Sequence, residues 1–425
     1  MNAEIITIGD ELLLGQTIDT NSAWLGQNLA KWGIHVQRKT AVSDKADAIV
    51  EALETSLNAA SLVIITGGLG PTRDDITKHT LAQFFNCGYR TDASVMAHLE
   101  KLFAKRGRTL LEVNKLQAEL PEACETLHNA VGTAPGMWFQ HNKGIVVSLP
   151  GVPNEVYYLM EHEVLPRLQK AFSLQTYEYR TLLCLETPES ILSKHLSHFE
   201  DELPEGYSLA YLPQFNSIRL RLSQKQQNQA EDKGIEFWFE RLQHALGILC
   251  FGVGDISAAE RVAQFLLDGS WEVSGAESCT GGFAINQLLQ VPGMSACVQG
   301  SMVAYGNPVK SRELGVLENT LKEHGAVSLE SGKEMAVGAL KKFGSDFAFS
   351  TTGIAGPGGG TDEKPVGTVC LTLVSTQEPK WTAVEGLSHE NGLWIYQKKK
   401  QIPGNRQQFM QRASNSLFAL FQPWF

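Results

Sequence analysis

Residues 277–282 bring several groups that are useful in acyl transfer into one short segment. The segment reads Glu-Ser-Cys-Thr-Gly-Gly, after a strand-like stretch at 271–276 and before a helix-like stretch at 283–290. A hydroxyl at Ser278 would therefore lie at a strand-to-helix turn, where the free N–H groups of a helix start converge. Acyl transfer requires such a nucleophile beside donors for an oxyanion. An ordinary glycine-containing turn with a capping Ser or Thr fits the same segment equally well.

Two further segments in the last third of the chain accompany this motif. They read GSMVAYGNPVK at 300–310 and STTGIAGPGGG at 350–360. Together with 277–282, they resemble the nicotinamide mononucleotide deamidase domain, PncC, of the competence/damage-inducible CinA family, over roughly 257–420. The resemblance implies hydrolysis of nicotinamide mononucleotide to nicotinic acid mononucleotide and ammonia, with no cofactor needed for this reaction.

The resemblance also implies roles for individual residues. Ser278 would be the nucleophile, Lys310 its base and Tyr305 the residue that positions them, with Cys279 as a rival nucleophile. A lysine base needs a depressed pKa, since its reference value is about 10.4. The N–H groups near 280–282 would hold the oxyanion, and residues 351–356 the ribose or phosphate. The substrate-binding candidates of this domain are Cys279, Thr280, Gly281, Gly282, Thr352, Gly353, Ala355, Gly356 and Arg406.

Ordinary structural roles remain open for two of these residues, and the binding role of a third is open. Without the motif, Lys310 would be interpreted as an exposed lysine at a helix start, and Tyr305 as an interior aromatic residue at a strand end. Asn405 stands where the family has an acidic residue before Arg406, and a longer polar insertion precedes it. The phosphate-binding role of Arg406 is therefore left open.

A second set of motifs lies within residues 1–165. Glycine-rich turns follow predicted strands, so their N–H groups can bind phosphates, assisted by the helix start that comes next. Glu11, Asp74 and Asp75 suit such a site if a divalent cation lies between the carboxylates and a pyrophosphate. Alternatively, Asp74 or Asp75 caps the following helix. The motifs are GDELLLG at 9–15, DTN at 19–21, GGLGPTRDD at 67–75, GTAPG at 132–136 and LPGVPNE at 149–155.

This region resembles the molybdopterin-binding MogA/MoaB-like fold and, more closely, the N-terminal domain of the CinA family. The resemblance implies metal-dependent hydrolysis of ADP-ribose, with cobalt or magnesium as the candidate divalent ion and potassium as a further ion. The fold alone leaves molybdopterin transfer open, because fold does not determine function. A non-enzymatic competence or DNA-repair scaffold is the remaining alternative. The candidate metal ligands are Glu11, Asp74 and Asp75, and the candidate nucleotide-binding residues are Gly9, Asp10, Asn21, Gly67, Gly68, Gly70, Pro71, Thr72 and Gly151.

The elements predicted around these motifs form three domains of an α/β protein. Residues 1–170 alternate strand and helix, with Asp44 able to cap the second helix, and predict a MogA/MoaB-like three-layer domain with a parallel sheet. Residues 171–254 predict a small α+β module, a spacer or dimerisation element. Residues 255–425 predict a three-layer α/β/α deamidase domain. The predicted strands are 3–9, 34–42, 62–66, 177–184, 207–212, 218–222, 271–276, 297–304, 346–352 and 366–374, and the predicted helices are 19–32, 44–60, 189–199, 229–246, 258–268, 283–290, 330–343 and 406–421.

Composition indicates an acidic, cytoplasmic protein and does not exclude a pocket for a nucleotide. Its 425 residues carry a formal net charge of −10, and the pI is near 5.6, which argues against non-specific binding of nucleic acid. No apolar run suits a signal peptide or a membrane span, and the seven scattered cysteines suit reduced thiols. The resemblance to the CinA family implies nicotinamide mononucleotide and ADP-ribose as ligands, and we expect a homodimer. The lysine run 398–400 is predicted to lie in a solvated loop, and His195 and His198 on a solvated helix surface.

Overall fold

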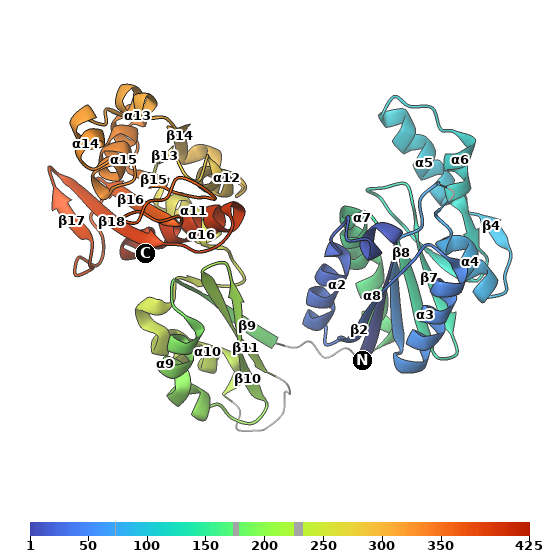
Figure 1. The fold of residues 1–425 in the computed structure, drawn as a ribbon. Coiled ribbons are helices and arrows are strands. Elements are labelled where there is room, and N and C mark those ends of the chain that lie inside the picture. Colours follow the sequence, from blue (N-terminus) through green and yellow to red (C-terminus); the bar gives the residue numbers. More distant parts are fainter. Residues whose placement is uncertain (73, 173–177, 225–232) are drawn as a thin grey trace. The chain divides into compact units, whose positions relative to one another are not determined.

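Each of the two units of the chain is built on β-sheets with helices packed against them (Figure 1). The units are Met1–Tyr177 and Glu178–Phe425. The computed structural model describes residues 1–72, 74–172, 178–224 and 233–425. Within these ranges, no helix combines the length and the apolar character that crossing a bilayer requires.

The first unit contains a six-stranded sheet of order β2-β1-β3-β8-β7-β6. β1 is parallel to β2 and β3, and β3 is parallel to β8, whereas β7 is antiparallel to both of its neighbours. The parallel pairing predicted for the first three strands is therefore confirmed. The bounds are β1 Asn2–Ile8, β2 His35–Val42, β3 Leu62–Thr66, β6 Cys124–Leu127, β7 Gly136–His141 and β8 Gly144–Leu149, with a separate pair, β4 Tyr89–Thr91 and β5 Glu119–Pro121.

Helices cover both faces of this sheet because its strands are apolar on both sides. In β1, Ile5 belongs to the core formed with α2, α7 and α8, whereas Ile6 belongs to the core formed with α3, α4 and α5. The predicted three-layer arrangement is confirmed. The bounds are α1 Asp10–Leu13, α2 Thr20–Lys31, α3 Ala46–Ala59, α4 Thr77–Phe84, α5 Ala93–Lys105, α6 Glu112–Lys115, α7 Pro153–Leu159 and α8 Leu165–Ala171.

The prediction that Asp44 caps the second helix is wrong. Helix α3 begins at Ala46, and Lys45 before it makes no side-chain capping hydrogen bond. The Asp44 carboxylate instead accepts a hydrogen bond of 2.9 Å from the N–H of Asp10. Asp44 thus links the segment after β2 to the start of α1, a contact between residues far apart in sequence.

The second unit begins with a four-stranded antiparallel sheet of order β10-β11-β9-β12. Helices α9 and α10 pack on it around a separate apolar core. His195 and His198 are exposed on α9, as predicted. The predicted start of the second helix, 229–232, lies outside the described residues. The bounds are β9 Glu178–Leu185, α9 Glu189–Asp201, β10 Tyr207–Gln214, β11 Ser217–Gln224, α10 Gly234–Leu246 and β12 Gly252–Val253.

The rest of this unit is a six-stranded sheet of order β14-β13-β15-β16-β18-β17. Strand β13, second from one edge, is parallel to β14 and β15, and the remaining pairs are antiparallel. The parallel strands place the ends of β13 and β15 at the same edge, where the candidate deamidase motifs follow. The bounds are β13 Val273–Glu277, β14 Val298–Val303, β15 Phe347–Gly353, β16 Thr368–Ser375, β17 Leu387–Glu390 and β18 Leu393–Gln401.

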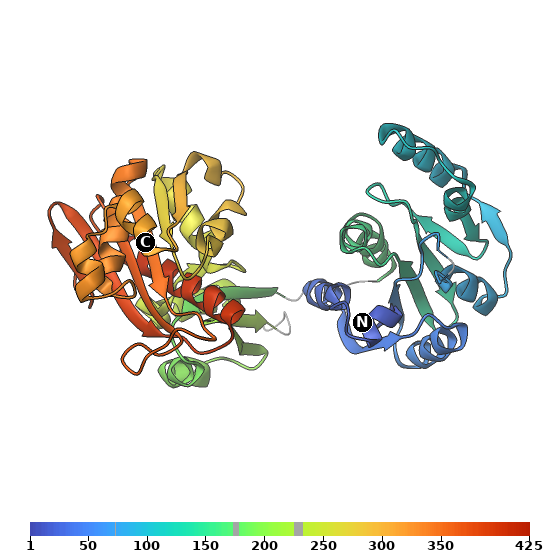
Figure 2. The same cartoon turned by 45° about the horizontal axis from the view of Figure 1, so that its top comes forward.

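Two helical layers enclose this second sheet. α11, α12 and α16 share one apolar core with it, and α13 and α15 share the other. In Figure 2, the orange helices that include α15 and the red helix α16 lie on opposite sides of the strands. The predicted α/β/α layering is confirmed. The bounds are α11 Ala258–Gly269, α12 Phe283–Leu289, α13 Asn307–Leu314, α14 Glu318–Glu323, α15 Leu329–Phe343 and α16 Arg406–Phe418.

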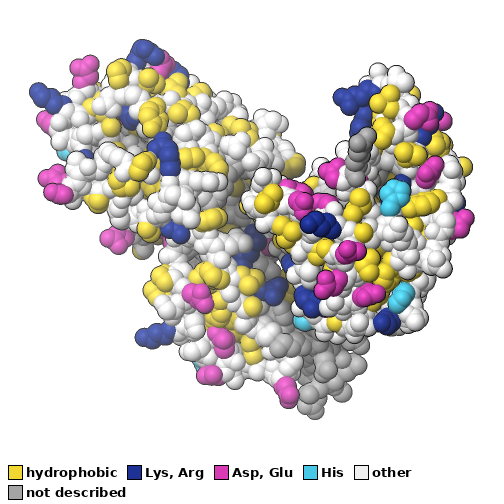
Figure 3. Space-filling model, turned by 45° about the vertical axis from the view of Figure 1, so that its right-hand side comes forward, with side chains coloured by type: hydrophobic (Ala, Val, Ile, Leu, Met, Phe, Trp, Pro, Cys, Tyr) yellow, Lys and Arg dark blue, Asp and Glu magenta, His cyan; other side chains and the backbone are white. Residues whose placement is uncertain are grey.

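The lysine run 398–400 is not in a solvated loop, so that prediction is wrong. It lies within β18, which pairs along its length with β16. Lys398 and Lys400 also form ion pairs with Glu186, a residue just after β9. Backbone pairing and a distant counter-charge thus order a segment whose local composition is typical of a loop. Elsewhere, the face of the molecule in Figure 3 carries interspersed acidic, basic and apolar side chains.

Candidate active site

Ser278 lies at the predicted strand-to-helix turn. β13 ends at Glu277, directly before it, and the N–H of Ser278 donates to the carbonyl of Thr351 at 2.9 Å. The turn then passes through Gly281 and Gly282, whose φ angles are 62° and 93°. L residues with side chains rarely adopt this backbone conformation, so the two glycines are required by the geometry of the turn. The Ser278 hydroxyl is left half-buried at the edge of the sheet.

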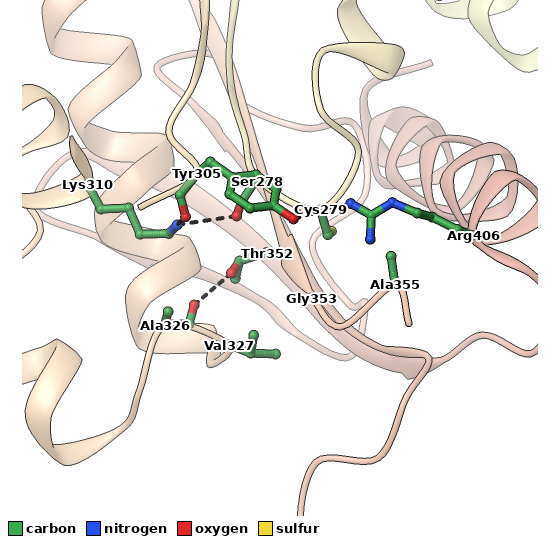
Figure 4. Close-up of a pocket in the computed structure, with 10 residues that line it drawn as sticks. All are labelled: Ser278, Cys279, Tyr305, Lys310, Ala326, Val327, Thr352, Gly353, Ala355 and Arg406. Carbon is green, nitrogen blue, oxygen red and sulfur yellow. Dashed lines mark hydrogen bonds between the residues drawn. The ribbon is translucent and has the colours of Figure 1, made fainter. Parts of the chain in front are cut away.

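Lys310 is brought to this hydroxyl by α13. Its Nζ atom lies 3.2 Å from Ser278 Oγ, 2.6 Å from the carbonyl oxygen of Ala304 and 3.0 Å from that of Tyr305 (Figure 4). The residue is only 1% exposed. Burial lowers the pKa of Lys310 below its usual value of 10.5, because an ammonium ion loses its hydration in the interior. The interpretation of Lys310 as an exposed helix-start lysine is therefore wrong.

The surroundings of Cys279 disfavour its thiolate, which is the reactive form. Its side chain is buried, and burial raises the pKa of the thiol to about 12. The thiol therefore stays protonated at neutral pH, and only the thiolate is reactive. Burial of the thiol therefore disfavours the rival assignment of Cys279 as the nucleophile.

A pocket of about 200 Å³ opens beside these residues. Lys310 lies at one end and Arg406 at the other, with Ala326 and Val327 on the side opposite Tyr305 (Figure 4). The sequence interpretation missed Ala326 and Val327, since small apolar residues before a helix form no motif. The lining residues are Ser278, Cys279, Tyr305, Lys310, Ala326, Val327, Thr352, Gly353, Ala355 and Arg406.

Tyr305 contacts a different partner from the one expected. Its hydroxyl accepts a hydrogen bond of 3.2 Å from Arg406, and only its backbone carbonyl contacts Lys310. Arg406 also donates to the carbonyl of Gly356 at 3.1 Å. The side chain of Asn405 caps α16 by accepting from the N–H of Gln408 at 3.0 Å. Asparagine thus keeps the helix start in place although the acidic residue of the family is absent.

The N–H groups expected to hold an oxyanion are partly engaged within the protein. The N–H of Gly281 donates to the carbonyl of Ser278 at 3.2 Å, and that of Gly282 donates to the carboxylate of Glu277 at 2.9 Å. Thr280 is buried, with its hydroxyl bound to the same carboxylate. Of the substrate-binding candidates, Thr280, Gly281, Gly282 and Gly356 do not line the pocket.

In the first unit, the sheet brings several nucleotide-binding candidates to one edge. Gly9 follows β1, Gly67 follows β3 and Gly151 follows β8. A Cβ atom on Gly67 would lie 2.3 Å from the carbonyl oxygen of Ile8, so this close approach requires glycine. Asn21 donates to the carbonyl of Gly151 at 2.8 Å, while its own buried Oδ1 has no partner among the described residues.

The loop after β3 carries the other nucleotide-binding candidates. Pro71 and Thr72 are exposed, as is Gly70, which approaches the Asp75 carboxylate. A Cβ atom on Gly68 would lie 2.1 Å from the buried Thr77 hydroxyl, which has no hydrogen-bond partner among the described residues. Buried polar atoms of this kind are costly unless a ligand or water satisfies them.

The candidate metal ligands of this unit do not converge on one point. The Asp75 carboxylate accepts hydrogen bonds from the N–H and the hydroxyl of Thr72, so it faces its own loop. Glu11 and Asp74 contribute negative charge near Asp44: burial and the carboxylates of Asp10, Glu11 and Asp74 raise the pKa of Asp44. Within the described ranges, no group of three or more His, Cys, Asp or Glu side chains is arranged to hold a metal ion.

Neither Asp74 nor Asp75 caps the following helix, so that alternative is also wrong. Helix α4 begins at Thr77, and Ile76 before it makes no side-chain capping hydrogen bond. Asp75 stabilises the loop at Thr72 instead.

Comparisons with known proteins match both halves of the chain. Residues 255–422 match the family described as CinA C-terminal domain, and residues 4–170 match the probable molybdopterin binding domain. A CinA-like protein of Chloroherpeton thalassium is 42% identical over 381 residues, covering 88% of this chain and 90% of that protein. A CinA-like protein of Gemmatimonas aurantiaca is 38% identical over 419 residues, covering 97% and 94%. The crystal structure of CinA from Thermoplasma acidophilum shares 36% identity over 40% of this chain and 96% of that chain, with a TM-score of 0.36.

Proposed function

This chain belongs to the CinA family, and we propose that its C-terminal domain hydrolyses the carboxamide of nicotinamide mononucleotide. The products are nicotinic acid mononucleotide and ammonia. One observation carries the proposal: the buried Nζ of Lys310 lies 3.2 Å from the hydroxyl of Ser278, at the wall of a pocket. A serine beside a depressed-pKa lysine is an attested arrangement for acyl transfer.

The surroundings of Lys310 favour its action as a base. The carbonyl oxygens of Ala304 and Tyr305 can only accept hydrogen bonds. A neutral lysine amine has two N–H groups and one lone pair, so two carbonyl contacts use both N–H groups. The lone pair is then left for the hydroxyl proton of Ser278. The lowered pKa of Lys310 makes this neutral form accessible.

The proposed reaction has two steps. Ser278 Oγ bonds to the carboxamide carbon as its proton moves to Lys310, and the C–N bond then breaks as Lys310 protonates the amide nitrogen, which leaves as ammonia. Water next attacks the acyl carbon and gives a proton to Lys310; the acyl–Oγ bond then breaks as Lys310 returns that proton to Ser278 Oγ, which releases the carboxylic acid. Because the N–H groups of Gly281 and Gly282 are engaged, we propose that of Cys279, directly after the nucleophile, as the oxyanion donor.

The rest of the pocket suits the remaining parts of this substrate. Arg406 lies across the pocket from Lys310 and offers a guanidinium for the phosphate. Ala326 and Val327 provide an apolar wall for the flat pyridine ring. A carboxamide, an aromatic ring and an anionic group thus each have a matching partner.

The direct test is ammonia release by the full-length chain supplied with nicotinamide mononucleotide. We expect equal amounts of ammonia and nicotinic acid mononucleotide, and no release from Ser278→Ala. Nicotinamide lacking the ribose phosphate should react much more slowly, because it makes no contact with Arg406. Absence of ammonia with the wild-type chain would refute the proposal.

For the first unit, we propose metal-dependent hydrolysis of the pyrophosphate of ADP-ribose. Two observations support it: the glycine-rich strand ends at Gly9, Gly67 and Gly151, and the negative charge gathered around Asp44. The described side chains alone do not form a three-ligand metal site. Magnesium, however, is commonly held by one or two carboxylates together with substrate phosphates. Molybdopterin transfer is the second candidate, and it predicts tight pterin binding without hydrolysis.

A further inference from the structure

The carboxylate of Glu277 is fully buried directly before the candidate nucleophile. Its exposed fraction is 0%, and it ends strand β13. A carboxylate in the interior is costly unless hydrogen-bond donors replace its lost water. Four donors do so here: the hydroxyl of Thr280 and the N–H groups of Gly282, Ala284 and Ile285, at 2.6, 2.9, 3.1 and 2.8 Å.

These donors lie on the far side of the turn that carries Ser278. One carboxylate therefore joins the end of β13 to the first turn of α12. The Thr280 hydroxyl also lies 2.6 Å from that of Thr351, whose carbonyl accepts the N–H of Ser278 at 2.9 Å. The backbone of Ser278 is thus held by Glu277 on one side and by strand β15 on the other.

We propose that Glu277 is a positioning residue for the deamidation, an inference that rests on the proposed function. It fixes the turn so that Ser278 Oγ faces Lys310 Nζ and the substrate carbon. Neither the composition of the motif nor the pocket lining indicates this role, because Glu277 does not line the pocket. The carboxylate also accepts hydrogen bonds from the N–H groups of Gly282, Ala284 and Ile285, so these groups do not bind an oxyanion. The N–H of Cys279 is then the oxyanion donor that we propose.

Glu277→Gln tests this role with almost no change in volume. The amide group has one acceptor oxygen, and its NH₂ group would face an N–H or O–H donor on one side, because donors approach both carboxylate oxygens. The turn must shift to relieve that contact. We expect kcat for nicotinamide mononucleotide to fall about 100-fold, the scale of misplacing a catalytic group by about 1 Å. KM should change less than about threefold, since Arg406 and the apolar wall are untouched.

Two companion variants separate positioning from stability. Ser274 lies in β13, the strand that ends at Glu277, and its hydroxyl forms a buried hydrogen bond of 2.7 Å with that of Ser345. Ser274→Ala removes this bond, so it should lower the melting temperature and leave kcat unchanged. Thr280→Val keeps the carboxylate and its three N–H donors but removes the hydroxyl. It should fold, and it should lower kcat about tenfold. If Glu277→Gln does not fold, Thr280→Val tests the positioning role in its place.

A second readout does not depend on the identity of the substrate. The rate at which a fluorophosphonate probe labels Ser278, read by peptide mass, should fall in Glu277→Gln as kcat does. Wild-type kcat and labelling in folded Glu277→Gln, or in Thr280→Val if Glu277→Gln is unfolded, would overturn the positioning role alone. A wild-type chain that neither releases ammonia nor labels at Ser278 would overturn the proposed function, and this inference with it.

Discussion

The Nζ atom of Lys310 lies 3.2 Å from the Oγ atom of Ser278, although 32 positions separate the two residues. Each comes from a different layer: Ser278 follows strand β13 of the sheet, and Lys310 is on helix α13 packed against the sheet. The contact therefore depends on the packing of α13, which buries the lysine. The packing of α13 brings Nζ close to Ser278, and burial lowers the pKa of Lys310, as a base requires.

Ser278→Ala should abolish deamidation, and Cys279→Ala should not. Alanine removes a single half-buried oxygen from a turn, so the free energy of unfolding should change by less than about 0.5 kcal/mol, while kcat falls by roughly 1000-fold or more. Cys279→Ala removes a thiol held protonated by a pKa of about 12, so activity should persist, with reduced stability. Ammonia release by both variants, with melting curves, decides the assignment; loss of activity only in Cys279→Ala would contradict it.

Lys310→Arg should be nearly inactive because a guanidinium stays protonated and cannot accept the serine proton. Substrate affinity should change much less than kcat. Since the site is buried, Lys310→Met is the matched variant: it keeps a similar length without placing a larger charged group in the interior. Single-turnover kinetics and substrate binding measure the two effects. Near-normal turnover in Lys310→Arg would show that Lys310 only stabilises charge, and near-normal turnover in Lys310→Met would show that neither its charge nor its action as a base is needed.

The parts of this site that follow from local geometry could be predicted from the sequence. The turn at Gly281 and Gly282 requires positive φ, and paired glycines after a strand indicate it directly. The alternation of strands and helices likewise predicts the layers and the edge where Gly9 and Gly67 meet. These features depend on residues close together in the chain, so their pattern is visible without the structure.

The parts that depend on distant contacts could not be predicted. The hydroxyl of Tyr305 bonds to Arg406, which is 101 positions away. The local sequence around Lys398 and Lys400 is typical of a loop, but pairing with β16 and ion pairs with Glu186 place the segment in a strand. The role of Asp44 depends on Asp10, which is 34 positions away in the sequence. In each case, the partner that determines the conformation is far away in the sequence, so the local sequence does not indicate it.

The deamidase rate should rise with pH through the lowered pKa of Lys310 and then level off. The neutral amine is the active form, so a higher pH increases the active fraction until deprotonation is complete. Because burial moves this pKa below 10.5, the ascending limb should lie below the range of an ordinary lysine. Values of kcat/KM from about pH 6 to about pH 10 measure it. A rate that falls across this range would show that the protonated lysine is the active form.

Arg406→Gln should raise KM for nicotinamide mononucleotide more than it lowers kcat. The guanidinium lies across the pocket from the reacting groups, so its loss removes binding to the phosphate in both ground and transition states. A charge-assisted hydrogen bond contributes about 1.5–3 kcal/mol, which corresponds to a KM increase of at least tenfold. Tyr305→Phe is the control, since it removes only the hydroxyl that accepts from Arg406 and should have a smaller effect. An unchanged KM in Arg406→Gln would place the phosphate elsewhere.

The ADP-ribose hydrolysis proposed for the first unit should require a divalent cation and stop when a chelator removes it. Asp75→Asn should weaken this activity without affecting deamidation, because the two sites lie in separate units. The structure also gives Asp75 a local role, since its carboxylate accepts two hydrogen bonds from Thr72. Asparagine keeps one acceptor oxygen and can preserve that loop. A lower rate of ADP-ribose hydrolysis with an unchanged melting temperature would therefore show that the negative charge of Asp75 is needed for activity.

Thr72→Val and Glu11→Gln separate the two roles of these carboxylates. Thr72→Val removes the hydroxyl donor to Asp75 and leaves every carboxylate in place, so it should disturb the loop but not the requirement for metal. Glu11→Gln removes charge near Asp44 and should raise the metal concentration needed for half-maximal rate. Titrating cobalt or magnesium against each variant yields this concentration directly. Chelator-resistant hydrolysis that is unchanged in Asp75→Asn and Glu11→Gln would refute the metal requirement, and a wild-type chain that binds ADP-ribose without cleaving it would refute the hydrolase proposal for this unit.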